Sequence, residues 1–206
     1  MNKLRKLSQL LFLCLFILLI LKGKMQLWMV IFLTGVVGAI FFERFFCGWI
    51  CPIYTITGTV EKIYQKLGIK KRKTPAFLKK PIFRYLMLGV FLMLFLIMMK
   101  TGKKLPILPA LLGVATIITL FFPESLWHHY LCPYGVILTI SGKKARRSFR
   151  VDEEKCINCG LCTKICPGEA VVEKEKNHQI DQRFCLECQQ CISTCPQEAI
   201  AYDRKE

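Results

Sequence analysis

Two stretches decide the C-terminal fold, CINCGLCTKICP (156–167) and CLECQQCISTCP (185–196). Each is a complete C-x2-C-x2-C-x3-C-P run. Three cysteines at i, i+3 and i+6 place three thiolates around one loop, and the fourth cysteine, followed by proline, is directed toward a second site. The spacing therefore predicts two [4Fe–4S] clusters, each completed by a cysteine from the other run.

This cross-ligation assigns four thiolates to each cluster. We expect one cluster on Cys156, Cys159, Cys162 and Cys195, and the other on Cys185, Cys188, Cys191 and Cys166. Zinc and disulfides are the alternatives, but zinc sites use separated C-x2-C pairs and disulfides are disfavoured in the cytoplasm.

The two runs belong to halves that repeat at an offset of 29 residues, from Cys156 to Cys185. Each half predicts a short strand, a cluster loop, a one-turn helix and a returning strand, at 170–172 and 199–202. We therefore expect an α+β two-[4Fe–4S] ferredoxin domain over 151–206. Because it has few large apolar side chains, it should not fold without its clusters.

The remainder of the chain contains four apolar runs without a charged residue, at 7–21, 25–42, 85–99 and 105–122. The second and fourth correspond to about 27 Å of helix, near the roughly 30 Å of a bilayer core. The shorter two are flanked by Lys and Arg, whose stems can reach the headgroups. Buried core helices of a soluble protein are the alternative for the four runs, but they would need a larger core than this chain can supply. A secretory signal peptide is the alternative for the first run, but no small-residue cleavage site follows it.

These runs predict an α-helical membrane domain at 1–142, with four transmembrane helices as two repeated hairpins, and a basic linker at 143–150. Residues 1–150 carry 23 Lys and Arg against 3 Asp and Glu. The basic residues flank the apolar runs, so membrane topology explains them better than nucleic acid does. The positive-inside rule places both termini, the basic loop at 43–84 and the ferredoxin domain in the cytoplasm of a multi-pass inner-membrane protein. The basic loop could also dock an acidic partner.

An internal repeat with an offset of 81 residues aligns FFERFFCGWICP (41–52) with the segment that ends at Cys132-Pro133. His128 takes the place of Cys47, so Cys47, Cys51, His128 and Cys132 form a candidate third centre, with ligands that suit iron–sulfur, copper or zinc. If the segment is helical, Cys47 and Cys51 share one face. Alternatively, the cysteines pack a helix bend, and His128 and His129 are interface residues.

Two further residues receive structural interpretations. Cys14, alone in a Leu/Phe run, is expected to pack as an apolar side chain. His178 lies in the charged link EKEKNHQ and is expected to be a solvated turn residue.

CGWICP beside a membrane hairpin, a second Cys-Pro-x-Gly segment after another hairpin, and the terminal two-cluster domain together resemble the NapH-like membrane polyferredoxin family. The resemblance covers nearly the whole chain. It implies electron transfer between a membrane quinone pool or cytoplasmic carriers and a partner redox protein. Family members usually carry C-x3-C-P in both segments, and His128 departs from that pattern.

We therefore expect a membrane-anchored electron-transfer subunit of an oxidoreductase system. It would pass single electrons between a soluble carrier of the ferredoxin or flavodoxin type and a quinone or partner redox subunit. The alternatives are a quinol dehydrogenase or metal-ion reductase centred on the Cys-Pro segments, or a redox-sensing or assembly protein. No nucleotide-binding fingerprint or Ser-His-Asp set is visible, and we expect contacts with membrane lipid but not with nucleic acid.

Overall fold

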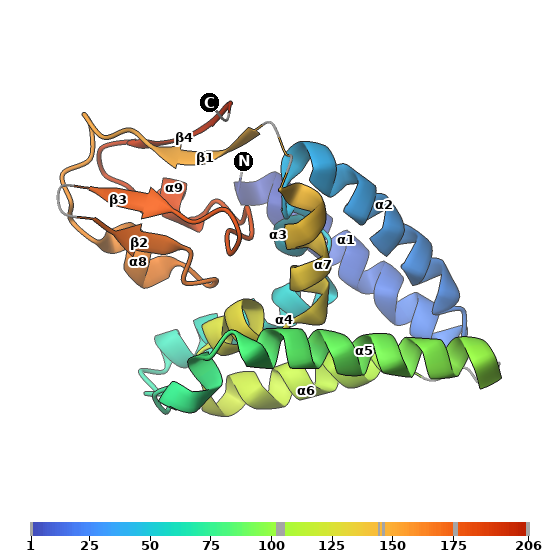
Figure 1. Ribbon diagram of the computed structural model, residues 1–206. Coiled ribbons are helices and arrows are strands. Elements are labelled where there is room, and N and C mark those ends of the chain that lie inside the picture. Colours follow the sequence, from blue (N-terminus) through green and yellow to red (C-terminus); the bar gives the residue numbers. More distant parts are fainter. Residues whose placement is uncertain (1, 102–105, 144, 146, 175–176, 205–206) are drawn as a thin grey trace.

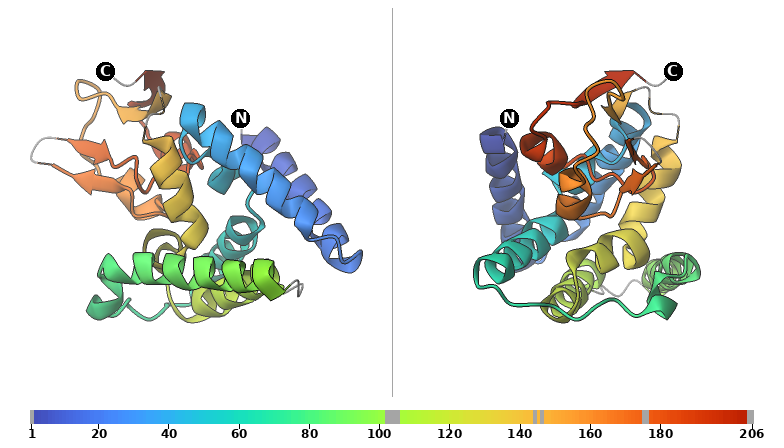
Figure 2. Two further views of the ribbon diagram at one scale, coloured as in Figure 1. Left: turned by 45° about the vertical axis from the view of Figure 1, so that its right-hand side comes forward. Right: turned by 90° about the vertical axis from the view of Figure 1, so that its left-hand side faces the viewer.

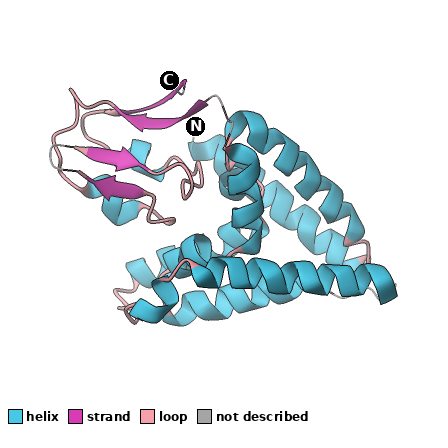
Figure 3. Ribbon diagram, in the orientation of Figure 1, coloured by secondary structure: helices cyan, strands magenta, loops and turns pink. Residues whose placement is uncertain are grey.

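The computed structural model of the chain describes residues 2–101, 106–143, 145, 147–174 and 177–204 (Figure 1). Helices make up the N-terminal part, called here the helical lobe (2–143). Two small sheets and two short helices make up the C-terminal lobe (147–204), as Figure 3 shows.

The four apolar runs form the four longest apolar helices of the described chain. These are α1 (Asn2–Leu21), α2 (Gln26–Phe42), α5 (Ile82–Thr101) and α6 (Ile107–Phe121). Two segments within them are long and apolar enough to cross a membrane, Lys3–Leu21 and Ile82–Thr101. The second and fourth apolar runs were expected to give the longer helices, but α2 and α6 are the shorter pair. Helices α1 and α5 are longer because they continue through their flanking basic residues.

Each Cys-Pro pair separates two helical segments. In the first copy, α3 (Phe45–Trp49) is followed by α4 (Pro52–Lys66); in the second, the π-helix η2 (Leu126–Leu131) is followed by α7 (Pro133–Gly142). Cys51 and Cys132 both adopt extended backbone, with ψ of 120° and 111°. A residue before proline is pushed out of the α region, and proline suits the first helical position. Cys47 and Cys51 therefore do not lie on one continuous helix, contrary to the expectation for an unbroken helix.

In the helical lobe, helices of one copy of the repeat pack against helices of the other copy. Helix α2 of the first copy packs on α7 of the second, and α6 of the second packs on α4 of the first. Within each copy, α1 contacts α4 and α5 contacts α7. The two hairpins extend away from the C-terminal lobe, while α3, α4, α7 and η2 lie beside it (Figures 1 and 2). A short 3-10 helix, η1 (Ala76–Lys79), precedes α5 and contacts η2.

The C-terminal lobe contains two antiparallel strand pairs. Strand β1 (Arg147–Val151) pairs with β4 (Ile200–Arg204), and β2 (Val171–Glu173) pairs with β3 (His178–Ile180). The one-turn helices α8 (Leu161–Ile165) and α9 (Gln190–Thr194) follow the two cysteine loops and contact each other. The returning strands thus lie within one residue of their predicted starts.

Two expectations for this lobe are wrong. Strand β1 begins at Arg147, inside the segment predicted as a linker, because Phe149 is buried and packs on Tyr202 across the strand pair, with ring centroids 4.9 Å apart. His178 is no solvated turn residue: it lies in β3 and is only 4% exposed. The two-residue period of a strand directs His178 and Ile180 to the same buried side.

Candidate functional site

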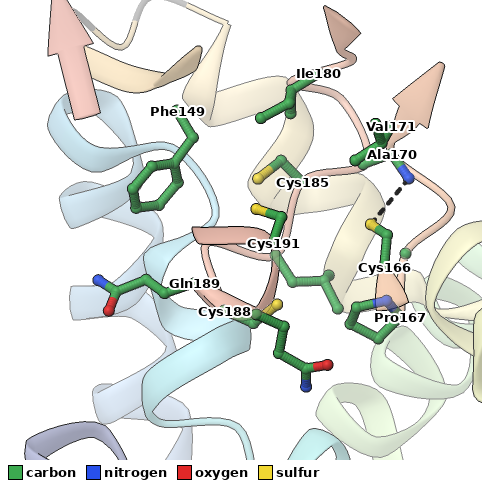
Figure 4. Close-up of a pocket in the computed structure, with 13 residues that line it drawn as sticks. Phe149, Cys166, Pro167, Ala170, Val171, Ile180, Cys185, Cys188, Gln189 and Cys191 are labelled. Atoms are coloured by element: carbon green, nitrogen blue, oxygen red, sulfur yellow. Dashed lines mark hydrogen bonds between the residues drawn. The ribbon is translucent and has the colours of Figure 1, made fainter. Parts of the chain in front are cut away.

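Two cavities lie among the described residues of the C-terminal lobe. One, called here the inner cavity, is lined by Cys166, Cys185, Cys188 and Cys191 (Figure 4). The other, the outer cavity, is lined by Cys156, Cys159, Cys162 and Cys195. The structure thus brings the fourth cysteine of each run to the first three of the other.

The donor sets suit a cluster better than a single ion. Within the residues that the structure describes, no three His, Cys, Asp or Glu side chains form a group that could hold a metal ion. Four thiolates of a [4Fe–4S] site bind four different irons, so they stand farther apart than the ligands of one zinc ion. The Ala170 N–H also donates a hydrogen bond to Cys166 Sγ at 3.3 Å, a contact typical of cluster ligands.

Burial dominates the acid–base behaviour of the inner thiols. It raises the pKa of Cys188 to about 11 and that of Cys191 to about 12. Burial outweighs the lowering effect of the Arg5 charge on the pKa of Cys188. These thiols therefore stay protonated near neutral pH until metal ligation releases their protons. The inner cysteines are therefore better suited to binding the positively charged core of an iron–sulfur cluster than to remaining as free thiolates.

The inner cavity faces the first Cys-Pro segment. A Cβ on Gly48 would lie 2.4 Å from the Leu186 carbonyl oxygen, so α3 touches the backbone of the cluster loop. Trp49 Nε1 donates to the Glu187 carbonyl oxygen at 3.3 Å. Gln190 Nε2 donates to the Tyr54 hydroxyl at 2.9 Å. The loop at 185–191 is thereby fixed to α3 and α4.

The second Cys-Pro segment also contacts residues around the inner cavity. His129 stacks on Phe184, with ring centroids 3.7 Å apart, and its Nδ1 lies 2.9 Å from the Gly168 carbonyl oxygen. A carbonyl only accepts, so this nitrogen carries the proton. Ser125 Oγ donates to Glu169 Oε1 at 2.7 Å. His129 therefore lies at the contact between the helical lobe and the C-terminal lobe.

The outer cavity is not enclosed in this way. Cys159 is exposed, and the neighbouring Ile157 is 60% exposed. One cysteine set thus adjoins the helical lobe, and the other opens to the surroundings.

Three of the four candidate ligands in the Cys-Pro segments come together. Cys47, Cys51 and Cys132 are buried. Burial and the neighbouring thiols Cys47 and Cys132 raise the pKa of Cys51, and burial raises that of Cys132 to about 11. Arg44 reaches the group, with Nη2 donating to Cys47 Sγ at 3.8 Å.

His128 makes its contacts with α4. Its Nε2 lies 3.1 Å from Thr57 Oγ1, and its ring meets Tyr54 edge-on at 5.5 Å. Burial lowers the pKa of His128 to about 3, so the ring is neutral at physiological pH. His128 is thus buried beside the segment, with Nε2 already engaged by a hydroxyl.

Sequence reasoning missed a set of buried arginines. Arg5 and Arg84 were expected to extend toward lipid headgroups, but both are buried, and so is Arg44. Arg84 donates to Thr139 Oγ1 at 2.9 Å and lies over the Phe184 ring. No ion pair within the described part of the chain includes any of the three. The available sequence signal was Arg44, three residues before Cys47 and replaced by Ser125 in the second copy.

Comparison with known proteins adds two family matches. A family described as "4Fe-4S binding domain" matches residues 25–73 and 105–152, and one described as "4Fe-4S dicluster domain" matches 149–202. The first covers both Cys-Pro segments, and the second covers all eight cysteines of the C-terminal lobe.

Several curated proteins are similar. The uncharacterized protein MJ0750 of Methanocaldococcus jannaschii is 30% identical over 199 residues, covering 80% of this chain and 81% of that protein. The ferredoxin-type protein NapH of Haemophilus influenzae is 28% identical (68% and 53% covered). The methylamine utilization ferredoxin-type protein MauN of Methylorubrum extorquens is 29% identical (63% and 49% covered). The chain thus spans about half the length of NapH and MauN. No solved structure matches.

Proposed function

Because the chain belongs to the NapH-like polyferredoxin family, we propose that it is an iron–sulfur electron transport protein that passes single electrons between a soluble carrier and a membrane acceptor. The carrier is of the ferredoxin or flavodoxin type, and the acceptor is a quinone or a partner redox subunit. One observation carries this proposal. The residues around the inner cavity contact both Cys-Pro segments, whereas the outer cavity is open to the surroundings.

Membrane anchoring by four helices is part of the proposal. Apolar side chains cover the outward surfaces of α1 and α5, where Leu7 and Leu86 are exposed. An apolar surface of this extent suits lipid better than water. Helices α2 and α6 are shorter but contain no charged residue. The basic segments favour cytoplasmic termini and a cytoplasmic C-terminal lobe in the inner membrane.

Two [4Fe–4S] clusters are the proposed cofactors, each held by one of the two cysteine sets. A bound cluster supplies reversible one-electron transfer, with a potential tuned by hydrogen bonds, charge and exposure. The chain positions the two sets in series: the outer set receives the soluble carrier, and the inner set adjoins the helical lobe. Ile157 and Leu161 form an exposed apolar rim on which the carrier docks.

A third redox centre on Cys47, Cys51 and Cys132 continues this series toward the membrane. Their convergence and the adjacent Arg44 guanidinium support it, because a cation stabilises thiolates. Thiolate and imidazole ligands suit iron–sulfur centres, copper and zinc. The description of the matching family favours iron–sulfur, and within the described residues these side chains do not form a group that could hold a single metal ion. His128 is the proposed fourth ligand, and it would have to exchange its Thr57 contact for the metal.

Electron transfer across the chain is directly measurable. The full-length protein is reconstituted anaerobically into vesicles that contain a lipid-soluble quinone, and reduced flavodoxin is added outside. We expect two flavodoxins to be oxidised per quinone, with two protons taken up. The control is the same vesicle with protein stripped of iron. Cluster-loaded protein that oxidises flavodoxin no faster than this control would contradict the proposal and would favour a sensing or assembly role.

A further inference from the structure

The two cavities differ at one repeat-related position. The 29-residue offset that relates the halves of the C-terminal lobe places His178 on Phe149. Phe149 lines the inner cavity, near Cys185 and Cys191 in Figure 4, and His178 lines the outer cavity. An imidazole thus replaces a phenyl ring beside the outer cysteine set.

His178 is held firmly at the outer cavity wall. It lies in β3, paired with Glu173 of β2, and is only 4% exposed. Its Nε2 lies 4.0 Å from the position of a Cβ on Gly160, in the loop between Cys159 and Cys162. This distance shows that the loop passes close to the ring. Gly160 has φ of 70°, in the left-handed region that glycine tolerates best.

One nitrogen of the buried imidazole has no hydrogen-bond partner among the described residues. Within the described residues, Nδ1 of His178 is buried without a hydrogen-bond partner. Leaving such a group unpaired is unfavourable, and a phenyl ring at this position, as in the other half, would avoid the cost. The sulfur atoms of a [4Fe–4S] site accept hydrogen bonds. A neutral imidazole always carries one N–H to donate.

We propose that His178 donates an imidazole N–H to sulfur of the cluster held by Cys156, Cys159, Cys162 and Cys195, and thereby raises the reduction potential of that site. The proposal rests on the two-cluster function above. A hydrogen bond to sulfur favours the reduced, more negative state. Phe149 cannot donate such a bond, so the two sites become unequal. The outer site then retains an electron received from the carrier more firmly than it would with a phenyl ring.

The test is a redox titration of the full-length, anaerobically loaded protein, followed by EPR. In His178→Phe we expect the reduced-to-oxidised ratio of the outer cluster to fall about tenfold at a fixed potential, equal to 59 mV for a one-electron couple. The reciprocal variant Phe149→His should raise the potential of the inner cluster. Unchanged potentials in His178→Phe with full cluster content would overturn the proposal.

A spectroscopic readout separates hydrogen bonding from packing. With ¹⁵N-histidine in the wild-type protein, pulsed EPR of the reduced outer cluster should show nitrogen coupling that disappears in His178→Phe. Should His178→Phe fail to bind iron, Phe149→His decides alone: a raised inner potential supports the proposal and an unchanged one rejects it. A wild-type protein without clusters would instead refute the proposed function.

Discussion

Gly48→Ala is expected to slow electron transfer from the C-terminal lobe to the quinone severalfold while leaving the iron content unchanged, because the added methyl group forces the loop that lines the inner cavity away from α3. The added Cβ would lie 2.4 Å from the Leu186 carbonyl oxygen and 3.2 Å from Cys188 Cα. Both are backbone atoms of the loop that lines the inner cavity, so the loop must move away from α3. Alanine suits a helix, so α3 itself should persist.

The matched control is Gly38→Ala in α2, where an added Cβ would meet nothing within 4 Å. This variant should transfer electrons at the wild-type rate. Stopped-flow reoxidation of the reduced lobe by quinone vesicles measures both. Equal rates in Gly48→Ala and Gly38→Ala would show that transfer does not depend on the docked geometry.

Cys51→Ser and Cys132→Ser should each abolish transfer to the quinone while both clusters of the C-terminal lobe remain intact. The two thiols are buried with Cys47 beside the Arg44 guanidinium. Serine preserves the size of the side chain but supplies no thiolate, so a centre built on these residues loses a ligand. The EPR signals of the C-terminal lobe should be unchanged, because its eight cysteines lie elsewhere.

Cys14→Ser, in the exposed face of α1, is the control and should transfer electrons normally. Vesicle turnover and iron content are measured together for all three variants. Persistent turnover in both Cys51→Ser and Cys132→Ser would mean that the Cys-Pro thiols only pack the helix breaks. Loss of the lobe signals in these variants would instead indicate that the thiols support docking.

Features that depend on local pattern could be predicted from the sequence. The spacing of Cys156 to Cys166 and its repeat fixed which cysteines would share a cavity, and the apolar runs located α1, α2, α5 and α6. Pro52 and Pro133 could have revealed the helix breaks, since the residue before proline avoids the α region. Their consequence, that Cys47 and Cys51 lie on separate elements, was overlooked.

Features that depend on contacts between distant segments could not be predicted. His178 lies among charged residues, and only its pairing in β3 buries it. Arg84 lies in the first turn of a long apolar helix, a position that suggested a contact with lipid headgroups. Its hydrogen-bond partners instead come from α7. The same holds for the interface: Ser125 and Glu169 are 44 residues apart in sequence, and neither belongs to a recognisable motif.

The most direct test of the account is metal and sulfide analysis of the full-length, anaerobically purified protein, combined with EPR. The account predicts at least about eight irons and eight acid-labile sulfides per chain, with reducible cubane signals from two interacting clusters. Zinc in place of iron, or only four irons with a single cubane signal, would contradict it.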